Sequence, residues 1–143
     1  MSSAVSTDSA AATCPQSAEP AAIEPKNTIM KMARPRARTQ FGRAIGSYQA
    51  ISHAIADMEV ELDAARLLLH RAAWHRMHHG TATRESAIAK LAVSEAYVRS
   101  CRQAIQIFGG YGYNTEVGLE RELRDALATT LYVGTSEIQR LSP

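Results

Sequence analysis

The feature that most constrains the fold is a run of apolar residues that recur at steps of three and four. They are Ile51, Ile55, Met58, Leu62, Ala65, Leu69 and Ala72. This spacing places their side chains on one face of an α-helix. The pattern predicts a helix over residues 45–79, ended by Gly80 in a left-handed cap. Such a helix is about 50 Å long at 1.5 Å per residue, a length typical of helical bundles.

A second stripe follows a short polar turn over residues 80–83. Its members are Ile88, Leu91, Ser94, Val98, Cys101, Ile105 and Phe108. They predict a helix over residues 85–108, stopped by Gly109 and Gly110. Because the turn is short, we expect the two helices to pack antiparallel. Trp74 and Met77, at the edge of the first stripe, are interpreted as packing residues.

Two shorter helices are expected near the C-terminus. The first covers residues 117–132, and Gly134 breaks it. Thr135 or Ser136 then caps a helix that is cut short, with Glu137 favourable in its first turn. The predicted core side chains of the first are Leu123, Leu127 and Leu131. With no internal repeat and no convincing strand, the predicted fold class is all-α, an incomplete antiparallel bundle of the four-helix type.

Residues 1–35 have a different composition from the rest of the chain. Ala, Ser, Thr and Pro dominate there, and large apolar residues are nearly absent. We therefore expect a disordered tail over residues 1–35 and one helical domain over residues 36–143. The tail lacks the features of a secretory signal or a mitochondrial presequence, which favours a cytoplasmic location. No run of 18 apolar residues occurs, so no membrane span is expected.

A basic cluster marks the junction of tail and domain. It consists of Lys31, Arg34, Arg36, Arg38 and Arg43. The cluster could bind phosphates through bidentate guanidinium contacts, or it could be a solvated linker. Binding of nucleic acid is not expected, because the cluster is short, few aromatic residues interleave it and the net charge of the chain is only +2.

Two further motifs favour structural interpretations. His75 and His79 share a helix face, but no third ligand is evident, so no metal site is expected. Histidines also suit the negative end of a helix. The glycine-rich run over residues 109–112 follows a helix and not a strand. It therefore lacks the context of a dinucleotide-binding loop and indicates a helix stop.

Eight sequence blocks, taken in order, point to one family. They cover residues 38–42, 48–50, 57–58, 61–66, 106–112, 120–121, 124–126 and 132–139. Through these blocks the chain from Arg38 to Arg140 resembles the C-terminal helical domain of the flavin-dependent acyl-CoA dehydrogenases. The resemblance implies a bundle of long helices, with FAD bound between the subunits of a dimer.

The resemblance also implies roles for individual residues. The implied FAD contacts are Arg38, Gln40, Phe41, Gln49, Gln106, Gly109, Gly110, Thr135 and Glu137. Arg38 matches the arginine that pairs with the FAD pyrophosphate, a suitable task for a fork-shaped cation. Gly109 matches a block that reaches the adenosine half of FAD held mainly by the partner subunit. Gly134 matches the glycine beside the acyl-CoA substrate.

The general base of the family reaction has no counterpart in this chain. The reaction, α,β-dehydrogenation of an acyl-CoA, needs a carboxylate that removes the α-proton. Many members place a glutamate at the position of Val133, and valine cannot accept a proton. Other members place it about 26 residues before Arg38, which falls near Ala12, whereas the nearest acids are Asp8 and Glu19. No catalytic residue is therefore assigned.

These observations lead to two expectations about function. The family's N-terminal and middle domains have no counterpart here, so we expect the chain to contribute FAD and subunit contacts without activity alone. Its partners would be acyl-CoA dehydrogenase subunits in a homo- or hetero-oligomer, and acyl-CoA would bind only within that assembly. The alternative is a non-catalytic remnant or a helical interaction module. The resemblance favours an enzyme, an FAD-dependent oxidoreductase acting on CH–CH bonds, although the general base and two domains have no counterpart in this chain.

Overall fold

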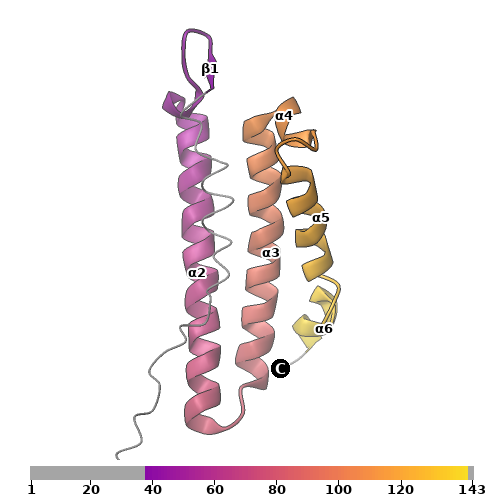
Figure 1. Cartoon of the computed structure of the whole chain (residues 1–143). Helices are drawn as coiled ribbons and strands as arrows, with labels where there is room; N and C mark the ends of the chain where they lie inside the picture. The colour runs from indigo at the N-terminus through magenta and orange to yellow at the C-terminus, as the bar shows by residue number, and fades with distance from the viewer. Residues whose placement is uncertain (1–37, 142–143) are drawn as a thin grey trace, which may run out of the picture.

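A computed structural model describes residues 38–141 and confirms the all-α class (Figure 1). The elements are β1 (Thr39–Gln40), β2 (Arg43–Ala44), a 3-10 helix η1 (Ile45–Ser47), α2 (Gln49–His79), α3 (Thr83–Phe108), α4 (Gly110–Tyr113), α5 (Leu119–Thr129) and α6 (Ser136–Leu141). The predicted tail, and with it Lys31, Arg34 and Arg36, lies outside the described residues.

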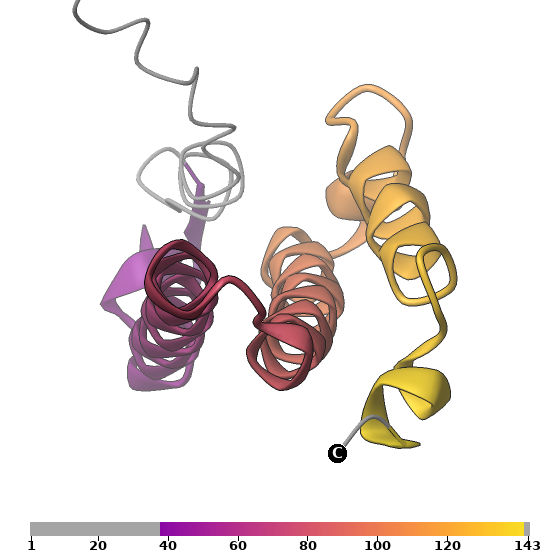
Figure 2. The same ribbon diagram turned by 90° about the horizontal axis from the view of Figure 1, so that it is seen from below.

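The helices form a row with α3 in the middle. α2 packs against one side of α3 as its antiparallel partner, while α5 and α6 pack against the other side (Figures 1 and 2). The β1–β2 ribbon and α4 lie at the end of the bundle where α2 begins and α3 ends. α6 lies towards the opposite end of the long helices. Within residues 38–141, none of the helices combines the length and the apolar character needed to cross a lipid bilayer.

The turn between α2 and α3 has the predicted glycine cap. Gly80 adopts φ +73°, and its N–H donates to the carbonyl oxygen of Arg76 at 3.2 Å. A left-handed residue there satisfies a carbonyl at the helix end and reverses the chain. The cap therefore fixes where α2 ends and where α3 starts back along it.

Two apolar clusters hold the row together, and α3 contributes to both. Cys101, Ala104, Leu119 and Ala126 are fully buried between α3 and α5. Ile45, Met58 and Ile107 form the second cluster, between η1, α2 and α3. Burial, followed by the negative charge of Glu122, raises the pKa of the Cys101 thiol to about 12. This thiol is therefore a protonated core group.

The predicted core of α5 is partly wrong. Leu123 is half-buried, but Leu127 is 48% exposed and Leu131 is 66% exposed. α5 packs on α3 through Leu119 and Ala126, and Leu127 lies at the edge of that face. Leu131 lies beyond Thr129, where the helix has already ended. Spacing alone therefore predicts more burial for Leu127 and Leu131 than the structure shows.

Apolar residues of α2 also differ in part from the prediction. Met58, Ala65 and Ala72 are buried against α3, as the stripe predicts. Leu69 is 55% exposed, because it faces an open groove. Trp74 and Met77, interpreted as packing residues, are also largely exposed. The side of α2 that carries Trp74 has no helix packed against it in the described part of the chain.

The expectation of no strand is wrong for one short ribbon. Thr39 pairs with Ala44, and Gln40 pairs with Arg43, in antiparallel register. Phe41 and Gly42 form the turn with φ of +54° and +79°, as in the tight turns that favour hairpins. Two-residue strands are too short to leave a period-two pattern in the sequence.

Replacing the most buried leucine of α5 tests the packing of α5 on α3. Leu119→Ala is expected to lower the free energy of unfolding by about 2–5 kcal/mol, because it leaves a cavity in the core. The matched change Leu127→Ala removes the same atoms from an exposed site, and we expect a loss below about 1 kcal/mol. Urea denaturation followed by circular dichroism measures both. Equal losses would contradict the packing described here.

Candidate functional site

Five of the predicted FAD-contact residues line one groove of about 400 Å³. They are Arg38, Gln40, Phe41, Gln106 and Gly109. The ribbon, the start of α2 and the end of α3 meet there, so the residues come from segments nearly 70 positions apart. Gln49 starts α2 and Gly110 starts α4, each next in sequence to a lining residue. The structure therefore brings seven of the nine residues to the end of the bundle where α2 begins and α3 ends.

Arg38 is anchored at this groove. Its Nη1 donates to the carbonyl oxygen of Phe108 at 2.6 Å, and its guanidinium carbon lies 5.8 Å from the centre of the Tyr111 ring. Its own carbonyl oxygen accepts the N–H of Ile45 at 3.0 Å. The bond to Phe108 uses one of the five N–H donors of the guanidinium. The side chain is thus held in place while it retains donor capacity for an anion.

Gly109 ends α3 beside Arg38 in a backbone conformation that favours glycine. Its φ of +60° and ψ of −141° are reached readily only by glycine. A Cβ at this position would lie 3.5 Å from Nη1 of Arg38. That distance is an ordinary van der Waals contact, so the backbone conformation is what selects glycine here.

Tyr48 holds the ribbon against the start of α2. Its hydroxyl donates to the carbonyl oxygen of Gln40 at 2.9 Å, and the guanidinium carbon of Arg43 lies 4.0 Å from its ring centre. Phe41 sits at the tip of the turn, is 87% exposed and has a positive φ. A large aromatic side chain is thus presented at the mouth of the groove.

The remaining predicted site residues lie on the loop between α5 and α6. Thr135 caps α6, since its Oγ1 accepts the N–H of Ile138 at 3.4 Å. Hydrogen bonds from the backbone and from Thr135 lower the pKa of Glu137. Arg140 ties α6 to the middle of α3 by an ion pair with Glu95, Nη2 to Oε1 at 3.4 Å. Gly134, beside this cap, has φ +87°.

The two groups of predicted site residues lie far apart. Glu95, next to α6, and Gly109 are separated by 14 residues of α3, which corresponds to about 21 Å along the helix. The structure therefore does not bring Thr135 and Glu137 to the groove of Arg38. One phosphate group cannot contact both groups within this chain.

Val133 occupies a strained position beside a second groove. It has φ +58° and is 82% exposed, and a β-branched residue in this conformation is a genuine outlier. Strain of this kind clusters at functional sites. The adjoining groove has a volume of about 410 Å³ and mainly apolar walls, including Leu69, Val93 and Tyr132. Among its described lining residues there is no carboxylate.

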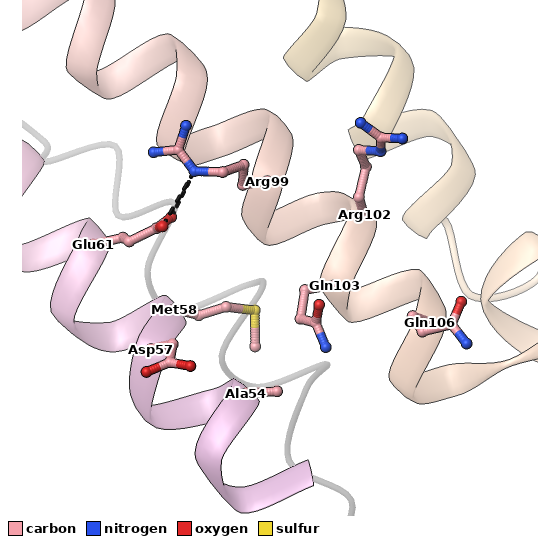
Figure 3. A pocket seen from close by; sticks show the side chains of 8 residues that line it. All are labelled: Ala54, Asp57, Met58, Glu61, Arg99, Arg102, Gln103 and Gln106. Carbon is pink, nitrogen blue, oxygen red and sulfur yellow. Dashed lines mark hydrogen bonds and ion pairs between the residues drawn. The ribbon is translucent and has the colours of Figure 1, made fainter. Parts of the chain in front are cut away.

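A third groove between α2 and α3 was missed by the sequence analysis (Figure 3). It measures about 500 Å³ and joins acids of α2, Asp57 and Glu61, to Arg99 and Arg102 of α3. Nε of Arg99 donates to both carboxylate oxygens of Glu61, at 3.0 and 3.2 Å. Gln106 lines this groove as well as the groove of Arg38. The opposite charges were visible in the sequence, but only the register of the two helices shows that they meet.

Metal ligation has little support from the described residues. The rings of His75 and His79 lie 4.7 Å apart, centre to centre. Within residues 38–141, no three His, Cys, Asp or Glu side chains are grouped so that they could hold a metal ion.

Comparison with known proteins shows the family. Residues 28–142 match the family described as acyl-CoA dehydrogenase, C-terminal domain. The short-chain specific mitochondrial acyl-CoA dehydrogenase of Mus musculus is 51% identical over 104 residues, which is 73% of this chain and 25% of that protein. The chain therefore belongs to the acyl-CoA dehydrogenase family and corresponds to its C-terminal domain.

Solved structures agree with this assignment. Butyryl-CoA dehydrogenase from Megasphaera elsdenii is similar with a TM-score of 0.78 and 36% identity, over 82% of this chain and 31% of that one. The FAD complex of PigA is similar with a TM-score of 0.76 and 37% identity, over 81% of this chain and 30% of that one. The chain thus spans between a quarter and a third of the length of these relatives.

A pair of alanine substitutions tests the selection of glycine at position 109. Gly109→Ala is expected to lower the free energy of unfolding by about 1–3 kcal/mol, because alanine is strained in this backbone conformation. Gly110→Ala is the matched control, since its added Cβ meets no atom within 4 Å; we expect a change below about 0.5 kcal/mol. Urea denaturation measures both variants. A larger loss for Gly110→Ala would contradict this account.

Proposed function

We propose that residues 36–143 serve a flavin-dependent acyl-CoA dehydrogenase by contributing FAD and subunit contacts. The observation that carries the proposal is the groove at which Arg38, Gln40, Phe41, Gln106 and Gly109 meet. These residues are far apart in the sequence, yet the fold gathers them beside one anchored guanidinium. The relative PigA forms an FAD complex, and it shares the fold of this domain.

The residues of the groove suit the nucleotide part of FAD. The guanidinium of Arg38 offers charge-assisted hydrogen bonds to phosphate oxygens. The amides of Gln40 and Gln106 can donate and accept hydrogen bonds, and the exposed ring of Phe41 offers an apolar surface. Gly109 lets backbone lie close to a ligand. When bound, FAD supplies the acceptor for the hydride that leaves the substrate.

The separation of the two residue groups favours a shared cofactor. The groove of Arg38 lies at the ribbon, the start of α2 and the end of α3. Thr135 and Glu137 belong to the start of α6, and α6 lies away from the ribbon (Figure 1). We infer that each group contacts a different FAD, so that each FAD is completed by another subunit. The partner is a homologous or identical acyl-CoA dehydrogenase subunit, and acyl-CoA binds only in that assembly.

The proton-abstraction step falls outside the role proposed for this chain. Val133 occupies the position at which many family members carry the glutamate base, and a valine side chain can only provide apolar contact. Gly134 would then lie beside the acyl-CoA substrate without taking part in the chemistry. The cytoplasmic location stays a prediction from the sequence.

A helical interaction module is the second candidate function. Exposed Leu127 and Leu131, and the apolar groove beside Val133, favour it, since large exposed apolar surfaces mark contact sites. Co-purification with a full-length homologue separates the candidates. A flavin absorbance band in the complex supports the first, and a stable helical oligomer without flavin supports the second. A random-coil circular dichroism spectrum would instead indicate a remnant.

Removing the guanidinium of Arg38 tests FAD binding. In the complex with a full-length homologue, Arg38→Ala is expected to weaken FAD binding roughly tenfold or more, because hydrogen bonds to charged groups contribute about 1.5–3 kcal/mol. Arg43→Ala is the matched control, since Arg43 sits on the same ribbon but stacks on Tyr48. Titration of the apo complex with FAD measures both. Unchanged affinity in Arg38→Ala would contradict the proposal.

Restoring a carboxylate at position 133 tests the missing base. In an assembly reconstituted with homologous subunits, Val133→Glu is expected to raise acyl-CoA oxidation, since a positioned general base contributes roughly 10²–10⁴-fold. Val133→Gln matches its size without accepting a proton, and no gain is expected. Single-turnover reduction of the flavin by acyl-CoA is the measurement. Equal rates for valine and glutamate would refute a lost base site.

A further inference from the structure

The last turns of α2 hold three of the chain's five histidines around its single tryptophan. The ring of Trp74 lies 4.4 Å from that of His78 and 5.6 Å from those of His75 and His79, centre to centre. These turns lead into the Gly80 cap, where the chain reverses into α3 (Figure 1). None of the residues assigned to FAD or to substrate lies in them, so the proposed function does not account for this cluster.

The rings of His75 and His79 are spaced like two ligands of one metal ion. Their centres lie 4.7 Å apart, and their planes are tilted by 35°. An ion bound to a ring nitrogen at about 2.0–2.1 Å lies about 3.2 Å from the ring centre. Two rings on one ion are then about 4.5 Å apart at a right angle and about 5.2 Å apart at a tetrahedral angle. The observed spacing therefore corresponds to neighbouring ligands of a square-planar or tetragonal ion.

The third histidine has a different task. Nδ1 of His78 donates to the carbonyl oxygen of Trp74 at 2.8 Å, since a carbonyl oxygen can only accept. The His78 ring also stacks on the Trp74 ring, with an angle of 24° between the planes. His78 therefore holds Trp74 beside the pair, and its Nδ1 carries a proton and is not free to bind an ion.

The arginines near the pair have partners of their own. Arg71 and Arg84 lie 3.8 and 3.7 Å from Glu85, nitrogen to oxygen, and Arg76 donates to a backbone carbonyl at the helix cap. Hydrogen bonding from the backbone, followed by nearby positive charges that include His75, lowers the pKa of Glu85. A carboxylate of α3 thus interacts with the pair, and the C-terminus of α2 adds partial negative charge. Both features favour a bound cation.

We propose that His75 and His79 chelate a tetragonal divalent cation of the first transition row, with Cu(II) bound more tightly than Ni(II). Two imidazoles at positions i and i+4 share one helix face, the arrangement of known helical metal sites. Copper(II) ranks above nickel(II) in affinity for such ligands. Residues 38–141 hold no group of three ligands, so water completes the coordination and the ion exchanges. The inference goes beyond the proposed function, because it involves neither flavin nor acyl-CoA.

Quenching of tryptophan fluorescence tests the site in the full chain. An ion between His75 and His79 lies within about 9 Å of the Trp74 ring centre, so bound Cu(II) is expected to quench the single tryptophan. The chain is titrated with CuCl2 at a fixed concentration of glycine, which competes for weakly bound copper. Cys14→Ser is the parent, because it removes a thiol that Cu(II) oxidises, whereas Cys101 is fully buried.

Substitution of either ligand is expected to abolish the chelate. His75→Gln and His79→Gln should each require at least tenfold more copper for half-maximal quenching, because in the parent the second bond forms within the molecule. Helicity by circular dichroism is expected to stay unchanged. Half-maximal quenching at the same copper concentration in the parent and in both variants would overturn the proposal.

The other histidines of α2 provide matched controls. His53→Gln and His70→Gln remove exposed imidazoles from the same helix, and His78→Gln removes the ring that stacks on Trp74. We expect each to change the half-quenching concentration less than threefold. A tenfold shift in any of them would show that the copper is bound elsewhere and would overturn the assignment to the pair.

Electron paramagnetic resonance of the Cu(II) complex gives an independent measurement. The parent is expected to show a tetragonal spectrum with two imidazole nitrogens on the copper, and His79→Gln is expected to show one. A spectrum that His79→Gln leaves unchanged would contradict the chelate. Because neither measurement uses flavin, a chain that chelates copper but binds no FAD would refute only the proposed function, and the reverse result would refute only this inference.

Discussion

The close packing of α3 between its neighbours is the interaction on which the rest of the structure depends. Small residues on several of its faces, among them Ala89, Ala96, Ser100 and Ala104, are buried, so backbones can approach from both sides. α2 lies on one side, and α5 lies on the other (Figure 2). Each candidate site is then built on α3. Its last turn supplies the carbonyl that anchors Arg38, and Glu95 in its middle binds Arg140 of α6.

The sequence predicted the elements that depend on local signals. Gly80 ends α2 with the predicted cap, and Thr135 caps α6, because turn and cap residues act through neighbouring backbone atoms. The prediction failed where tertiary packing decides. It assigned one apolar stripe to α3, although a helix between two neighbours also buries small residues outside that stripe. Periodicity alone does not show where a short helix ends, which is why Leu131 was placed in the core. Leu127 lies within α5, but at the edge of its buried face.

The candidate site also divides into features that the sequence predicts and features that only tertiary packing decides. The residue types at Arg38 and Gly109 were found through the family resemblance, and the fold brings them to one groove. Their mutual placement could not be derived from spacing, since 70 residues of hairpin separate them. The distance from Thr135 and Glu137 to that groove could not be derived from the sequence either. Under the proposed function, this separation is the reason that each FAD site would be completed by residues of a second subunit.

Helix α2 illustrates why a helix with apolar residues on two sides is hard to interpret from sequence. α2 has apolar residues on nearly opposite sides, Met58 and Ala65 towards α3 and Val60 and Leu67 away from it. A search for one apolar face assigns the inner series to the core and leaves the outer series as isolated exceptions.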